Sequence, residues 1–301
     1  MNGIRNTLKQ TILRTYKLIS STCIQKRLGY PKDTKLLIIH ADDLGLSASE
    51  NAATIEAFNR GIVTSGSIMV PCQGFDEIAR YARDHPEADL GVHLTLTNEW
   101  ISYKWKPVMT TNEVRSLIDD EGFFLRDKRS LQNKSSLPEI EKELRAQIDL
   151  ALKTGIDVTH LDSHMFIAFS PKLLKIYSDL GKKYKLPILL SKKLPLCHLI
   201  ARDSIIVDKL FYAEPEDFAR GLDKFYRNTL ESLEPGLNSI LIHPAFNNKE
   251  MKEITRNQVN DGAAWRQSDF DFFTSDACRQ LIIDNKIKLI TWREIRDKLV
   301  R

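Results

Sequence analysis

Residues 36–45 constrain this chain most, because an apolar run there ends directly in two carboxylates. The run at 36–39 is typical of a strand buried on both faces. Buried charge is costly unless it is paired or bound to a metal, so Asp42 and Asp43 favour a functional site at the strand end. Successive strand residues point to opposite faces, so both acids serve one site only if the chain turns there, and Gly45 can supply a turn. A simple turn-and-cap role for the two aspartates is the alternative.

Strand-like and helix-like segments alternate along most of the chain. We expect further strands near 65–70, 90–96, 157–163, 187–190, 204–207, 238–245 and 287–291, and helices near 48–60, 75–84, 138–153, 171–184, 215–232, 275–285 and from 292 onward. This alternation indicates parallel strands joined by crossover helices. The predicted fold class is α/β: a single, TIM-like (β/α) barrel with seven or eight parallel strands, in a regular or a distorted form.

One domain with an N-terminal extension is expected. Residues 1–34 form an N-terminal helical extension, and residues 35–301 form the barrel. Basic residues recur through the first thirty positions, so no uninterrupted apolar core of a signal peptide forms there. A short amphipathic helix that packs on the outside of the barrel is the favoured interpretation, and a helix on a membrane surface is the alternative.

The composition argues against several classes of protein. The 44 basic and 40 acidic residues nearly cancel to a net charge of +4. The sequence also lacks the basic stripe interleaved with aromatic residues that would indicate nucleic-acid binding. No apolar run approaches the roughly 18 residues of a membrane-spanning helix, so stable membrane insertion is not expected. The four cysteines (Cys23, Cys72, Cys197 and Cys278) lie far apart, which favours free thiols and a cytoplasmic location. A homodimer is compatible with the sequence, which does not define the oligomeric state.

Residues 97–137 interrupt the strand–helix alternation with a polar, irregular segment. A loop of this length inside a compact domain is usually functional, often as a lid or a substrate wall. Its aromatic residues could stack on sugar rings or pack the loop onto the domain. We expect packing for Trp105, and the sequence leaves both roles open for Trp100 and Tyr103.

Groups suited to catalysis follow four of the predicted strands. They are Asp42 and Asp43, His93, Asp162 with His164, and His243. The carboxyl ends of parallel barrel strands meet at one face, where such folds place their active sites. A lone histidine on a strand is more often a core residue than a ligand, but four independent strand ends weaken that explanation. One aspartate and two histidines are a recurrent ligand set for a divalent metal with open positions.

Four short motifs carry a resemblance to a known family. They are His-Ala-Asp-Asp-Leu-Gly-Leu-Ser at 40–47, Gly-Val-His-Leu-Thr-Leu-Thr at 91–97, Thr-His-Leu-Asp-Ser-His at 159–164 and His-Pro-Ala-Phe at 243–246. In this order and spacing they resemble the YdjC-like carbohydrate deacetylases, which include chitooligosaccharide deacetylases and are related to NodB-type polysaccharide deacetylases. The resemblance implies a metal-dependent (β/α) barrel that hydrolyses acetamide groups on small N-acetylated sugars.

The resemblance also implies a role for each motif residue. Asp43 resembles the metal-binding aspartate, and His93 and His164 resemble the two metal-binding histidines. Asp42 resembles the catalytic base that activates the attacking water, and His243 resembles the histidine that protonates the departing amine. One divalent ion is expected, with magnesium and zinc the first candidates and cobalt and nickel also open.

Other polar residues have supporting or structural roles in this interpretation. Asp162 is expected to orient a ligand histidine from behind, and His160 is expected to be structural. Trp265, Arg266 and Asp269 form a late polar cluster. Arg266 could hold a carboxylate or a substrate oxygen, and a surface salt bridge is the alternative.

The chain departs from the family pattern after the third motif. Residues 165–168 read Met-Phe-Ile-Ala, where members of the family often carry further histidines. The expected metal ligands are retained, but the lining of the substrate pocket differs, and so the identity of the sugar is open.

The predicted function is hydrolysis of acetyl groups from N-acetylated sugars or short oligosaccharides. A metal-dependent amidase on another acylated amine or a glycolipid is one alternative, and a catalytically silent carbohydrate-binding barrel is another. A sugar isomerase on a similar barrel would need further acidic ligands at other strand ends, and the sequence does not offer them. The expected partner is therefore a small carbohydrate.

Overall fold

A parallel β-sheet forms the centre of the protein in a computed structural model that describes residues 23–194, 204–257 and 261–301. The strands are β1 (Lys35–Leu44), β2 (Ser65–Ile68), β3 (Leu90–Leu94), β4 (Leu161–Ser163), β5 (Lys209–Phe211), β6 (Gly236–Ile242) and β7 (Ile287–Leu289). Their order is β4-β3-β2-β1-β6-β5, and β7 pairs with the beginning of β1. Every strand pair is parallel, as the alternating sequence predicts.

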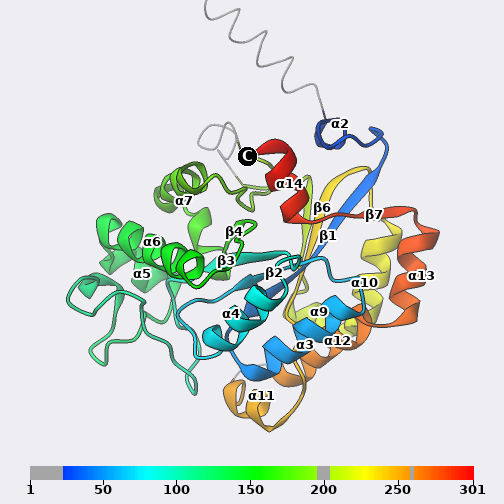
Figure 1. The fold of residues 1–301 in the computed structure, drawn as a ribbon. Coiled ribbons are helices and arrows are strands. Elements are labelled where there is room, and N and C mark those ends of the chain that lie inside the picture. Colours follow the sequence, from blue (N-terminus) through cyan, green and yellow to red (C-terminus); the bar gives the residue numbers. More distant parts are fainter. Residues whose placement is uncertain (1–22, 195–203, 258–260) are drawn as a thin grey trace, which may run out of the picture.

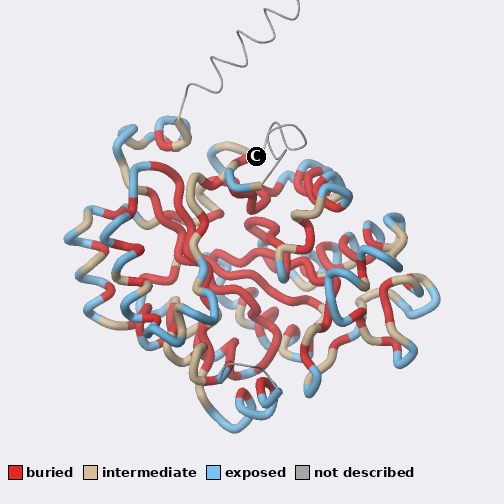
Figure 2. The backbone as a smooth tube through the Cα atoms, turned by 180° about the vertical axis from the view of Figure 1, so that it is seen from behind, coloured by how far each residue is buried: buried red, intermediate tan, exposed pale blue. Residues whose placement is uncertain are grey.

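Helices surround this sheet, as Figure 1 shows. They are α2 (Ile24–Leu28), α3 (Ala48–Asn59), α4 (Phe75–Asp84), α5 (Lys128–Lys134), α6 (Leu137–Lys153), α7 (Pro171–Tyr184), α9 (Pro215–Arg220), α10 (Leu222–Glu231), α11 (Lys249–Ile254), α12 (Gly262–Phe273), α13 (Asp276–Asp284) and α14 (Trp292–Leu299), with short 3₁₀ turns η1 (Arg115–Leu117) and η2 (His164–Phe169). α6 and α7 lie on the β4 side, and α10 and α13 lie on the opposite side. The buried strands stand out against the exposed outer faces of the helices in Figure 2.

The two faces of β1 belong to different hydrophobic cores. Leu37 and Ile39 pack in the large core beneath the surrounding helices. Leu36 and Ile38 pack in a smaller cluster on the other face, which also includes Val207, Leu237, Leu241 and Trp292. Side chains of a strand alternate between its two faces, so His40 and Asp42 continue the face of the smaller cluster toward the carboxyl end of the strand.

The sheet is a curled, parallel half-barrel, and the closed TIM-like barrel is not confirmed. Beyond β4, the described residues continue the backbone pairing only through isolated parallel bridges, which join Leu161 to Ile188 and Ser191 to Val207. The segment expected as a strand at 187–190 therefore contributes a bridge and no regular strand. The strand expected at 204–207 starts later, as β5 at Lys209.

Several predicted helices have different bounds in the structure. The helix expected over 215–232 is divided into α9 and α10, because Gly221 between them adopts φ +95°. The segment at 97–137 is largely irregular as expected, but it includes η1 and α5. α11 and α12 were not predicted at all.

The N-terminal extension is described only from residue 23 onward, so most of the predicted extension lies outside the described residues. α2 packs against the last helix, α14. Tyr30 donates a hydrogen bond to Glu294 (2.8 Å), and the Lys298 ammonium donates to the carbonyl of Leu28 (2.9 Å). Cys23, Cys72 and Cys278 are free thiols, and Cys197 lies outside the described residues.

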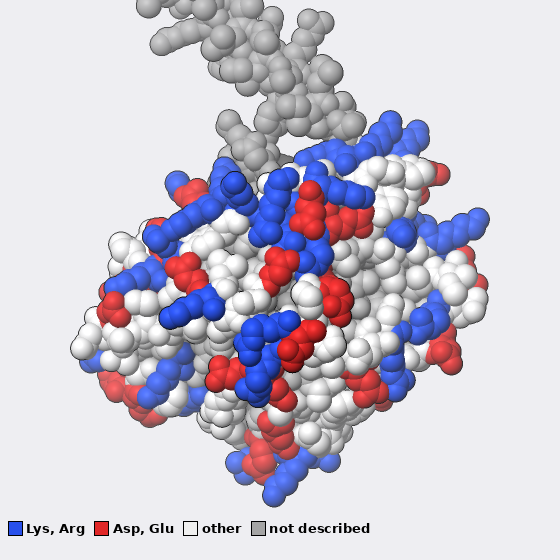
Figure 3. Space-filling model, in the orientation of Figure 1, with Lys and Arg blue, Asp and Glu red and all other residues white. Residues whose placement is uncertain are grey.

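The described surface carries charges of both signs. Basic and acidic side chains are interspersed over the face seen in Figure 3. Within the described ranges, every helix is too short or too polar to cross a bilayer.

Gly91 in β3 is required by the ring of His160. A Cβ at this position would lie 2.4 Å from Cε1 of His160, closer than real Cβ contacts come. The ring cannot easily move, because it stacks on Trp292 with centroids 5.2 Å apart. We expect Gly91→Ala to lower the free energy of unfolding by about 1–3 kcal/mol in urea melts. In a His160→Ala background the same change should cost much less, and equal costs in both backgrounds would contradict the clash.

Candidate active site

The carboxyl end of β1 turns sharply at Asp43. This residue has φ 66°, in the left-handed region that non-glycine residues rarely adopt, and the register of β1 on β2 shifts between Ala41 and Leu44. The turn brings the side chains of both Asp42 and Asp43 to one site, where the regular alternation of a strand would separate them. Gly45 follows with φ +85°, and Ser47 caps α3 by accepting a hydrogen bond from the Glu50 amide.

Three side chains from three strand ends converge at this turn. Oδ1 of Asp43 lies 3.4 Å from Nε2 of His93 and 3.3 Å from Nδ1 of His164. The two ring nitrogens lie 3.3 Å from each other. All three residues are buried, and they form one of the groups that could hold a metal ion. The structure therefore brings these three predicted residues together, and their role as metal ligands stays a prediction.

The outer nitrogens of both histidines face carboxylates. Nδ1 of His93 lies 2.8 Å from Oδ1 of Asp162. Nε2 of His164 lies 2.9 Å and 3.1 Å from the two carboxylate oxygens of Glu99. If these outer nitrogens carry the protons, the lone pairs of the inner nitrogens point at Asp43 and at each other. Carboxylates in this position fix the tautomer and orientation of metal-binding histidines.

The electrostatics of the group favour positive charge between the three side chains. Burial opposes the ionised form of Asp43, but His164 and His93 outweigh it and hold the pKa of this carboxyl well below its usual range. Burial also opposes protonation of His164, but Glu99 and Asp43 raise its pKa to about 9. The pKa of His93 is raised as well, against burial, by the charges of Asp162 and Asp42. Either protons or a bound cation can supply this positive charge.

The donor set fits a divalent cation on independent grounds. Oδ1 of Asp43 is buried and has no hydrogen-bond partner within the described residues. A buried carboxylate oxygen without a partner is costly unless a cation contacts it. One carboxylate and two imidazoles at mutual distances of 3.3–3.4 Å match a three-sided ligand set that leaves positions open.

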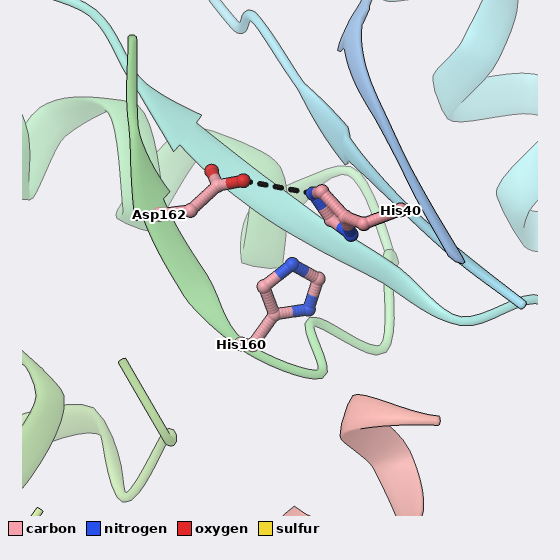
Figure 4. Close-up of side chains that lie close together, drawn as sticks. All are labelled: His40, His160 and Asp162. Atoms are coloured by element: carbon pink, nitrogen blue, oxygen red, sulfur yellow. Dashed lines mark hydrogen bonds and ion pairs between the residues drawn. The ribbon is translucent and has the colours of Figure 1, made fainter. Parts of the chain in front are cut away.

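A second potential cluster, formed by His40, His160 and Asp162, is better explained by packing. Figure 4 shows the hydrogen bond between His40 and Asp162, with the ring of His160 beside them. His40 is already engaged, with Asp162 at 2.8 Å and Ser65 at 3.0 Å. His160 is stacked on Trp292 and pressed against Gly91, and burial lowers its pKa, so packing accounts for its position, as expected for a structural residue.

Asp42 and His243 face each other beside the three converging side chains. Nε2 of His243 lies 3.8 Å from Oδ2 of Asp42 and 4.0 Å from Oδ2 of Asp43. The other oxygen of Asp42 lies 3.1 Å from Nε2 of His40. The side chain of His243 is 35% exposed and lines a cavity of about 440 Å³, a volume within the range of small-molecule sites. The predicted acid therefore lines an accessible cavity, and the buried carboxylate of the predicted base lies next to it.

Arg266 lies behind the turn at Asp43 and is only 9% exposed, so the surface salt bridge is ruled out. Its guanidinium donates to Glu50 (2.9 Å) and lies 3.5 Å from Oδ2 of Asp43. The same group sits over the ring of Trp100, 5.1 Å from its centroid. Arg266 therefore holds a carboxylate, and it also lines the cavity.

Other aromatic and polar residues from the sequence analysis have distinct positions. Trp105 is buried and donates to the carbonyl of Thr97, as expected for a packing role. Trp100 lines the cavity, whereas Tyr103 donates to the carbonyl of Leu46. Asp269 is buried away from the cavity and accepts from the backbone amide of His243 (2.9 Å).

Two carboxylates of the site, Glu99 and Glu50, were not predicted from the sequence. Glu99 lies in the irregular segment six residues after His93, and its position near a strand end was the available signal. Glu50 stands three residues after Ser47, a spacing typical of a helix capping box. Because capping of α3 already accounts for Glu50 in the sequence, its contact with Arg266 could not be predicted.

Comparison with known proteins is consistent with this arrangement. A model of the YdjC-like protein family matches residues 36–284. A carbohydrate deacetylase from Brevibacillus brevis is 31% identical over 260 residues, which cover 86% of this chain and 99% of the relative. A carbohydrate deacetylase from Thermus thermophilus is 29% identical, covering 88% and 95%. A crystal structure from Enterococcus faecalis, of a protein named for a proposed cellobiose-phosphate cleavage activity, has a TM-score of 0.74 at 28% identity, covering 87% and 99%.

Proposed function

Because this chain belongs to the YdjC-like protein family, we propose that it is a metal-dependent carbohydrate deacetylase that hydrolyses acetamide groups on N-acetylated sugars or short oligosaccharides. One observation carries the proposal: the inner ring nitrogens of His93 and His164 meet a buried oxygen of Asp43 beside His243, which lines an accessible cavity. A divalent cation held by these three residues would polarise the amide carbonyl and lower the pKa of water beside it.

The remaining residues divide the proton transfers of amide hydrolysis. Asp42 takes the proton of the attacking water, since its carboxylate lies beside the three proposed ligands and faces His243 (3.8 Å). His243 gives a proton to the departing amine, because its Nε2 is directed at the same region from another strand. Arg266 holds Asp43 in place, and Asp162 and Glu99 orient the two histidines.

The test combines metal analysis with acetate release. We expect the purified protein, dialysed against each candidate cation in turn, to retain about one divalent ion per chain. It should then release acetate from N-acetylglucosamine or its short β-1,4-linked oligomers. Bound metal without acetate release from any amino sugar would favour another acylated amine as substrate. Absence of both metal and turnover would favour a carbohydrate-binding protein.

His243→Ala tests the proposed acid. Amide cleavage requires protonation of the amine as it leaves, and a general acid contributes roughly 10²–10⁴-fold to the rate. We expect a loss of that size on an N-acetylated sugar, measured as kcat. An activated ester of acetate has a leaving group that needs no proton, so its hydrolysis should fall far less. Equal losses on both substrates would contradict the acid role.

A further inference from the structure

The ring of His40 is buried beside the proposed site, although the proposed mechanism gives it no role. His40 lies in β1, two residues before Asp42, and is 1% exposed. Residues two apart on a strand point to the same side, so His40 and Asp42 share one face of β1. A buried histidine must find partners for both ring nitrogens, and here each nitrogen meets a different set.

The Nδ1 atom of His40 faces a hydroxyl oxygen that can only accept. It lies 3.0 Å from Oγ of Ser65 on β2. The Ser65 hydroxyl donates its one proton to Asp89 (3.0 Å). Asp89 also accepts from the hydroxyl of Thr159 (2.7 Å) and from the backbone amide of Arg293 (2.7 Å), so its carboxylate acts as an acceptor. The oxygen of Ser65 is left to accept from the ring, and Nδ1 of His40 therefore carries a proton.

The Nε2 atom of His40 faces two carboxylates. It lies 2.8 Å from Oδ2 of Asp162, the hydrogen bond drawn in Figure 4, and 3.1 Å from Oδ1 of Asp42. Oδ2 of Asp162 also accepts from the hydroxyl of Ser67 (2.7 Å). Because ionised carboxylates only accept, Nε2 carries a proton as well. Burial opposes protonation of His40, but Asp162 and Asp42 outweigh it and raise the pKa of the ring to about 9.

The two carboxylates need a donor between them. Asp42 and Asp162 offer oxygens within 4.8 Å of each other, in a group that also includes His93. Like charges at this distance repel each other. Oδ1 of Asp42 is buried without a well-aligned hydrogen bond in the described chain, and its ion pair with His40 is the contact that opposes this repulsion. Without His40, the carboxylate of Asp42 would be free to turn away from Asp162.

We propose that His40 is a positioning residue, which donates from both ring nitrogens and thereby holds the carboxylates of Asp42 and Asp162 in place. The proposal rests on the proposed deacetylase function, in which Asp42 takes the proton of the water and Asp162 orients His93. None of the contacts described for His40 is with the three proposed ligands. His40 therefore acts on the reaction only through the two carboxylates that it holds.

The two ring protons of His40 can be observed directly by nuclear magnetic resonance. In the zinc-loaded protein, which is diamagnetic, isotope-labelled histidine side chains give one signal for each ring N–H. We expect two such signals from His40, both exchanging slowly with water because the ring is buried. Both signals should vanish in His40→Gln, which identifies them. A single ring N–H signal from His40 would overturn the proposal.

Two substitutions separate the contacts of the two nitrogens. Asparagine places its amide near the position of Nδ1 and is too short to reach the carboxylates, whereas glutamine reaches the position of Nε2. At saturating metal, His40→Asn should lower kcat for acetate release from N-acetylglucosamine oligomers roughly 10–100-fold, the usual effect of losing a supporting partner, with KM nearly unchanged. His40→Gln should lose clearly less, because its amide can still donate to Asp42 and Asp162.

His160→Asn is the matched control, because it makes the same change in a neighbouring buried histidine. The two ring centroids lie 4.9 Å apart, and packing on Trp292 accounts for His160. This control should lower the free energy of unfolding and leave kcat unchanged. An unchanged kcat in His40→Asn, an equal fall in His160→Asn, or equal losses in the two His40 variants would each overturn the positioning role. If no amino sugar is hydrolysed, the deacetylase function is rejected, and the ring N–H signals still decide whether His40 donates from both nitrogens.

Discussion

Replacing Asp42 with asparagine should leave the metal content of the protein unchanged and lower kcat for acetate release by roughly 10²–10⁴-fold. Asparagine has nearly the same size and still offers an oxygen to His40, which lies 3.1 Å from Asp42, so the fold should tolerate it. It cannot take a proton from water. The expected signature is therefore a fully metal-loaded protein with almost no turnover, measured by metal analysis and by acetate release on the same sample.

Asp43→Asn is the matched control, since it makes the same chemical change one residue away. Asp43 lies between His93 and His164, with its Oδ1 3.3–3.4 Å from a nitrogen of each ring. This variant should lose metal and turnover together. If both variants lost metal to the same extent, Asp42 would be assigned as a ligand, and its role as the catalytic base would be rejected.

The convergence of the site could be predicted because it depends on parallel strands ending at one face. Asp43, His93 and His164 follow three strands that are far apart in the sequence, and the pairing of β1 to β2, β2 to β3 and β3 to β4 brings them together. The turn that makes both aspartates available was predicted at Gly45. It starts earlier, at Asp43 itself, because a left-handed aspartate leaves no signal in hydrophobic patterning.

Three features were not predicted for physical reasons: helix α12, the incomplete closure of the barrel and the role of Glu99. α12 buries Arg266 and Asp269 together with Phe270 and Phe273, so charged residues interrupt the apolar pattern that would predict a helix. Closure of the barrel depends on how residues 187–191 and Val207 pair, and they form isolated bridges although their sequence suits a strand. Glu99 belongs to a loop, where its contact with His164 is set by tertiary structure.

His93→Ala and His164→Ala should each lower metal affinity sharply, because each removes one of only three protein ligands in the proposed site. The structure also offers a graded comparison. Glu99→Gln keeps all three ligands but replaces the carboxylate that orients His164. Changes to such supporting partners typically weaken metal binding roughly 10–100-fold. We therefore expect Glu99→Gln to fall between the wild type and the two histidine variants in a competition titration with a chelator.

His85→Ala provides the control for this series, because His85 is exposed at the end of α4 and contacts only Tyr81 and Glu87 among the interactions described. The metal affinity of the His85→Ala variant should equal that of the wild type. Full metal occupancy in both His93→Ala and His164→Ala would break the ligand assignment, and with it the proposed mechanism. If metal affinity fell in His93→Ala and His164→Ala but not in Glu99→Gln, the ligand assignment would stand and the orienting role of Glu99 would be rejected.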